Sequence, residues 1–98
     1  MVDLRFEWDP VNAVINLRKH GATFEEAQTA FLDDRALIVD DPEHSGDESR
    51  LVLLGLSASL RMLVVVHVHR TDRDTIRIIS ARRATKSERG TYAMRLQR

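Results

Sequence analysis

The chain has 98 residues, of which 43% are hydrophobic and 31% are charged, a balance typical of one globular domain spanning residues 1–98. It contains no cysteine, which excludes a disulfide framework and a cysteine zinc site. Its apolar runs are too short to cross a bilayer, and its N-terminus lacks the pattern of a secretion signal. We therefore expect a cytoplasmic protein that makes no membrane contact.

The net charge of zero conceals an uneven distribution of charge along the chain. Residues 1–48 hold 12 acidic and 4 basic side chains, whereas residues 49–98 hold 3 acidic and 11 basic ones. Thirteen of the 15 basic residues are arginine, whose planar guanidinium can bind a phosphate or carboxylate through two parallel hydrogen bonds. The C-terminal half therefore predicts a positive surface suited to a phosphate-bearing partner, with ordinary solvated surface charge as the alternative.

The first elements in chain order are a short extended segment at Phe6–Trp8 and a helix over residues 10–20. Asp9 is a suitable N-cap, Pro10 suits the first helical position, and Gly21 suits the left-handed residue that ends a helix. One face of this helix is apolar. Its apolar side chains are Val11, Val14 and Ile15.

The next elements are a second short helix and a strand. Thr23 and Glu26 form a capping box at the start of this helix, whose apolar stripe includes Phe24 and Ala27. The β-branched content of Ala36–Val39 predicts a strand. The polar segment 41–47, which contains proline and glycine, predicts an exposed loop.

Three further runs have the length of strands: Leu51–Leu56, Met62–Val68 and Thr75–Ala81. Their short connections predict an antiparallel meander. A second capping box, Thr85 to Glu88, begins a C-terminal helix. The predicted fold class is α+β, a small antiparallel sheet with helices in the order β-α-α-β-β-β-β-α.

Strict alternation on the last strand predicts which side chains share a face of the sheet. One face is expected to carry Ile76, Ile78 and Ser80, and the other to carry Arg77, Ile79 and Ala81.

Two histidine patterns could carry chemistry. His44 and Glu48 lie four residues apart in the polar loop, as an acid/base pair, as part of a metal site, or simply as solvated loop residues. His67 and His69 alternate on one strand, an arrangement that fits two metal ligands but lacks an apparent third. The simpler interpretation of His67 and His69 is a surface pair near a strand end.

The densest group of basic residues begins on the last strand and continues into the C-terminal helix. Its members are Arg77, Arg82, Arg83, Lys86 and Arg89. Such a group could hold RNA phosphates, and RNA cleavage without a metal needs a base, an acid and cations that stabilise the phosphorane charge. The alternative is an arginine–glutamate network, with Arg77, Glu88 or Glu48 as members, that ties the last helix to the sheet.

Several blocks of the sequence, in this order, resemble the BrnT toxin family. They are Phe6–Pro10, Asn16–Gly21, Phe24–Ala27, His44–Ser45 with Glu48 and Arg50, Gly55 with Ser57, Ile76–Ala84, and Glu88–Arg89 with Tyr92. This resemblance implies a RelE-like fold and the ribonuclease toxin of a type II toxin–antitoxin system. It also implies inhibition by a BrnA-like ribbon-helix-helix antitoxin, and promoter DNA binding only through the toxin–antitoxin complex.

The chain departs from the usual pattern of this family at two positions. Asn12 stands where the family usually has a basic residue, and Leu60 stands where it often has glycine before an arginine. The first departure removes a possible phosphate contact, and the second alters a hairpin turn.

The resemblance and the basic group together define the expected site, with no metal and no cofactor. The expected catalytic residues are Arg77, Arg82, Arg61, Glu48, His44 and Tyr92. The expected RNA-binding residues are Arg83, Lys86, Arg89, Arg50 and Lys19. We therefore expect an endoribonuclease that acts on messenger RNA. The alternatives are a catalytically weak module that partners an antitoxin as a co-repressor, and a nucleic-acid-binding domain without cleavage.

Overall fold

The computed structural model of the chain describes residues 4–41, 50–70 and 72–96. The elements follow in the predicted order β-α-α-β-β-β-β-α. They are β1 (Arg5–Glu7), α1 (Pro10–His20), α2 (Phe24–Ala30), β2 (Leu37–Asp40), β3 (Arg50–Leu56), β4 (Met62–Arg70), β5 (Thr75–Arg83) and α3 (Lys86–Leu96). Within the described ranges, no helix is long and apolar enough to span a membrane.

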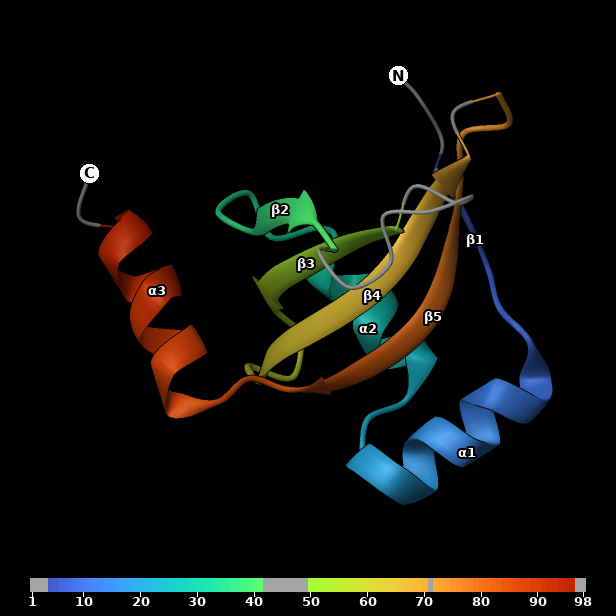
Figure 1. The fold of residues 1–98 in the computed structure, drawn as a ribbon, viewed down its shortest axis with the longest axis horizontal. Helices are drawn as coiled ribbons and strands as arrows, with labels where there is room; N and C mark the ends of the chain where they lie inside the picture. Colours follow the sequence, from blue (N-terminus) through green and yellow to red (C-terminus); the bar gives the residue numbers. More distant parts are fainter. Residues whose placement is uncertain (1–3, 42–49, 71, 97–98) are drawn as a thin grey trace.

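The strands form one five-stranded sheet in the order β1-β5-β4-β3-β2 (Figure 1). Strands β2 to β5 form the predicted antiparallel meander. The sheet as a whole is mixed, because β1 pairs with β5 in parallel. A parallel neighbour needs a long crossover connection, and α1 and α2 lie in the connection that separates β1 from the meander.

Each face of the sheet has its own core. Helices α1 and α2 cover one face, where Phe24, Leu53, Leu63, Val65 and Ile78 are almost fully buried. The opposite face has a smaller core under α3. Its members are Leu54, Val64, Ala84 and Tyr92. Helix α3 stands apart from α1 and α2, near the β2–β3 end of the sheet (Figure 1).

Helix α1 has the predicted caps but not a buried apolar face. The Asp9 carboxylate accepts a hydrogen bond from the Val11 amide, and Gly21 has the left-handed φ of 70°. Val14 and Ile15, however, are 51% and 55% exposed. The buried residue of α1 is the polar Asn16.

Strand β5 contains a β-bulge at Ile79. On β4, Val66 pairs with Ser80, and the next residue, His67, pairs with Ile78, so Ile79 has no partner in the register. One extra residue reverses the alternation beyond the bulge. The prediction that Ser80 shares a face with Ile78 is therefore wrong, and Ala81 takes its place in the core with Ile78.

The β3–β4 hairpin places Leu60 in the left-handed region, with φ of 63°. This conformation costs a residue with a Cβ roughly 1–2 kcal/mol, a cost that glycine avoids. The side chain is 78% exposed and contributes little packing. We expect Leu60→Gly to raise the free energy of unfolding by about 1 kcal/mol, measured by urea denaturation. Ala58→Gly, at an exposed neighbouring position without positive φ, should not stabilise the protein.

Candidate nucleic-acid interface

The sheet face that carries α3 also carries four arginines from three adjacent strands. Arg50 of β3 and Arg77 of β5 both pair with Val68 of β4 and therefore flank it. Arg70 lies two residues beyond Val68 on β4, and Arg82 pairs with Val64. Directly opposite residues in a sheet project from the same face. We call the surface formed by Arg50, Arg70, Arg77 and Arg82 the arginine face.

The bulge at Ile79 is what places Arg77 and Arg82 on one face. These residues are five apart in sequence, so regular alternation would put them on opposite faces. Their partners on β4, Val68 and Val64, are four residues apart, which corresponds to about 13 Å of strand. Two arginine side chains that leave the backbone this far apart on one face can both reach the phosphates of one strand of nucleic acid.

Both of these arginines also have a carboxylate partner. Arg77 Nη1 lies 3.1 Å from Glu7 Oε2, and Arg82 binds Glu88 through two hydrogen bonds of 2.8 and 2.9 Å. The hydrogen bonds from Arg82 are the main reason that the pKa of Glu88 falls to about 2. The two arginine side chains remain 36% and 40% exposed. Arginine–glutamate pairs are therefore present, but Arg77 pairs with Glu7 and not with the expected Glu88, which binds Arg82 instead. Both guanidinium groups are still accessible to a ligand.

Arg70 is a member of the arginine face that sequence reasoning missed. Within the described ranges, its Nε is the buried side-chain atom without a hydrogen-bond partner. A guanidinium N–H prefers a carboxylate or phosphate acceptor, so Arg70 has a donor that the described residues leave unused. Regular alternation along this strand could have identified Arg70 from the sequence, because it continues the face of Val66 and Val68.

Arg61 lies away from the arginine face, contrary to its expected place in the site. It forms an ion pair with Glu26 of α2 and donates to the Gly21 carbonyl, on the side of the sheet covered by α1 and α2. The hydrogen bonds from Arg61 lower the pKa of Glu26. Arg61 thus ties the β3–β4 hairpin to both helices and does not meet Arg77 or Arg82.

Tyr92 is also placed differently from the expectation. Its hydroxyl donates a 2.6 Å hydrogen bond to Asp33, and its ring is 7% exposed within the smaller core. Burial, together with this bond, raises the pKa of Tyr92 to about 12. The residue fastens α3 to the turn before β2, so the structure gives it an anchoring position.

The other expected RNA-binding residues are dispersed. Arg83 pairs with Leu63 and so belongs to the face covered by α1 and α2, and Lys19 lies in the last turn of α1. Lys86 and Arg89 are exposed near the start of α3, beside the arginine face at Arg82. His44 and Glu48 lie outside the described residues.

His67 is a buried residue rather than the expected surface histidine. It is 1% exposed, its ring lies 4.8 Å from that of Phe31, and its Nδ1 is 3.1 Å from the Val65 carbonyl oxygen. Its neighbour His69 is exposed. Within the described ranges, no group of three histidine, aspartate or glutamate side chains could hold a metal ion.

The burial of His67 predicts a pH dependence of stability. Desolvation lowers the pKa of His67 below 6.5, so the unfolded chain binds this proton more readily than the folded one. The contribution of neutral His67 to the free energy of unfolding is complete above about pH 6.5. It is lost as the pH falls below this value, by up to about 1.4 kcal/mol per pH unit. Urea denaturation between pH 8 and 5 should show this slope. It should disappear in His67→Leu and persist in His69→Gln; equal slopes in both variants would contradict the assignment.

Comparisons with known proteins agree with the fold and with the family that the sequence resembles. The model of the family of ribonuclease toxins BrnT, of type II toxin–antitoxin systems, matches residues 8–88. The 1.1 Å crystal structure of the Brucella abortus ribonuclease toxin, BrnT, is similar in fold, with a TM-score of 0.66. The two sequences are 21% identical, over 86% of this chain and 100% of that chain. No curated protein matches the chain significantly.

Proposed function

Because this chain belongs to the BrnT family of ribonuclease toxins of type II toxin–antitoxin systems, we propose that it cleaves messenger RNA on the arginine face. Cleavage is metal-independent in this proposal and stops growth by removing templates for translation. The observation that carries the proposal is the bulge at Ile79, which brings Arg77 and Arg82 to the same face as Arg50 and Arg70. A bulge next to a functional site commonly redirects a side chain in this way.

The chemistry that such a face supports is an internal transesterification. The 2′-oxygen of the RNA forms a bond to phosphorus while the bond to the 5′-oxygen breaks. The 2′-proton passes to a general base, and the 5′-oxygen takes a proton from a general acid. Arg77 and Arg82 stabilise the charge that develops on the phosphorane oxygens.

The general base and acid of this proposal are His44 and Glu48. The described residues on either side of them in the sequence are Asp41 and Arg50, and the Asp41 amide donates to the Arg50 carbonyl. In the sequence, Glu48 stands two residues before Arg50, a member of the arginine face. Glu88 is unsuited to the role of base, because its pKa is about 2 and Arg82 binds both of its oxygens.

The second candidate function is that of an antitoxin partner and co-repressor with little catalytic activity. The observations that favour it are the ion pairs that already occupy Arg77 and Arg82, and the structural placement of Tyr92. In either case we propose a cognate ribbon-helix-helix antitoxin as partner, with promoter DNA bound only through the complex.

Expression of the chain alone in bacteria separates the two functions. Growth arrest with loss of messenger RNA supports the ribonuclease, whereas normal growth together with tight antitoxin binding supports the co-repressor. Purified protein should cleave RNA in the presence of a chelator and leave cyclic phosphate ends. Cleavage that stops on chelation would contradict the metal-independent chemistry.

A further inference from the structure

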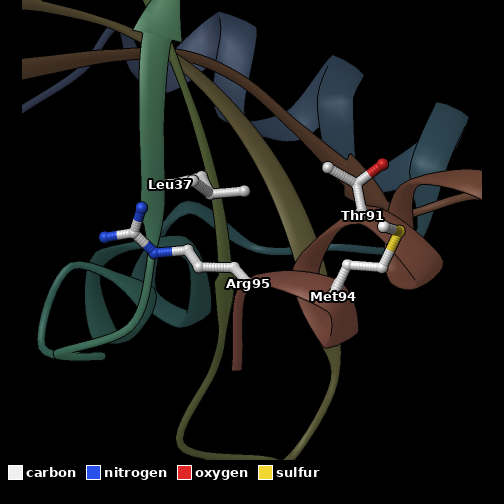
Figure 2. Close-up of a pocket in the computed structure, with 4 residues that line it drawn as sticks. All are labelled: Leu37, Thr91, Met94 and Arg95. Carbon is white, nitrogen blue, oxygen red and sulfur yellow. The ribbon is translucent and has the colours of Figure 1, made fainter. Parts of the chain in front are cut away.

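A groove lies between α3 and the edge of the sheet, on the same side as the arginine face. Its wider part, of about 500 Å³, is lined by Leu37 of β2 and by Thr91, Met94 and Arg95 of α3. Figure 2 shows these side chains of α3 opposite Leu37. A second hollow of about 170 Å³ shares two of these residues and so continues the groove over the sheet. It is lined by Leu37, Val39, Val52, Leu54, Val64, Glu88 and Thr91.

Apolar side chains of the groove are exposed, and helix α3, which forms one wall of the groove, is fixed to the rest of the domain. Met94 is 68% exposed, and Val39 of the edge strand β2 is 56% exposed. Helix α3 is fixed to the body by the bond from Tyr92 to Asp33 and by the pair of Arg82 and Glu88. The groove can therefore receive a partner without first being assembled.

The chemistry of the groove favours a polypeptide over RNA. Its floor is aliphatic, and the described lining offers no aromatic ring on which a base could stack. Helix α3 carries three basic residues, Lys86, Arg89 and Arg95, and one acidic residue, Glu88, which Arg82 already binds. Of the basic residues, Arg95 lines the groove. The complementary occupant is a segment with apolar side chains and at least one carboxylate.

We propose that this groove is the docking site for an acidic, apolar segment of the cognate antitoxin. The proposal rests on the proposed function only for the identity of the partner. Apolar side chains of the segment occupy the floor, and a carboxylate pairs with Arg95. Because Glu88 both lines the groove and binds Arg82, an antitoxin seated there continues directly onto the arginine face. Neutralisation then follows from occlusion of the RNA site.

The test separates antitoxin binding from RNA cleavage. The toxin variants Met94→Glu and Val39→Asp introduce a charge at exposed groove positions, whereas Val11→Glu does so on the exposed apolar face of α1. We expect the groove variants to bind purified antitoxin at least about tenfold more weakly, which corresponds to about 1.4 kcal/mol. Their RNA cleavage should be unchanged, and Val11→Glu should bind normally. Binding by the wild type should persist in ~1 M salt, where charge pairs are screened beyond about 3 Å.

Three results would overturn the proposal. Wild-type affinity in both groove variants would exclude the groove, and weakened binding in Val11→Glu alone would assign the antitoxin to α1. Loss of RNA cleavage with antitoxin binding retained would assign the groove to RNA. If the wild-type protein cleaves no RNA, the proposed function fails, but the binding measurement still decides whether the groove is the antitoxin site.

Discussion

Replacing Arg77 with alanine is expected to lower the rate of RNA cleavage by about 100-fold, the typical effect of removing one group that stabilises a developing negative charge. The fold should tolerate this change, because the ion pair with Glu7 is 36–37% exposed and exposed pairs contribute about 0–1 kcal/mol. Rates of cleavage of a defined RNA by purified protein, together with thermal unfolding midpoints, are the measurements.

Arg18→Ala is the matched control for Arg77→Ala. It removes the same charge from an exposed position on α1, away from the arginine face, and should change cleavage only slightly. Arg70→Ala should behave like Arg77→Ala if an RNA phosphate accepts a hydrogen bond from the Arg70 guanidinium. Equal and small effects of Arg18→Ala and Arg77→Ala would mean that the arginine face is not the site of cleavage.

Local signals in the sequence predicted the helices well. Helix α1 begins after Asp9 and ends before Gly21, as expected. At the start of α3, Thr85 and Glu88 form the two hydrogen bonds of a capping box. These features depend on residues within one turn of each other, so a single sequence contains the information that determines them.

The features that determine the site depend on distant residues instead. Nothing near Ile79 in the sequence indicates a bulge, because it arises from the pairing of β5 with β4. The parallel pairing of β1, with three residues, is likewise set by tertiary packing. Sequence reasoning therefore grouped Arg77 with Arg82 but did not place them on one face of the sheet. It omitted Arg70, although regular alternation along β4 puts Arg70 on the face of Val66 and Val68. It also placed Arg61 in the site, whereas the distant Glu26 holds it elsewhere.

The role of Asn16 also depends on residues distant in the sequence. Its replacement is expected to have the largest effect on the free energy of unfolding. Its amide donates to the carbonyls of Ala22 and Ala81, at 2.9 and 2.8 Å, and its side-chain oxygen accepts from the Ala81 amide at 3.0 Å. Strand β1 pairs with β5 only from Thr75 to Arg77. The side chain of Asn16 therefore satisfies the edge of β5 beyond the end of β1, and joins α1 to the sheet.

Asn16→Ala is expected to lower the free energy of unfolding by about 3 kcal/mol, since it leaves buried backbone groups without partners at a cost of roughly 1–3 kcal/mol each. For a domain of this size that corresponds to a fall in Tm of more than about 10 °C. Asn12→Ala is the matched control, because Asn12 is exposed on the same helix and alanine has the higher helix propensity. Urea denaturation should therefore show Asn12→Ala equal to or slightly more stable than the wild type. If Asn16→Ala lost less than about 1 kcal/mol, water would have to reach the edge of β5 at Ala81 and replace the amide there.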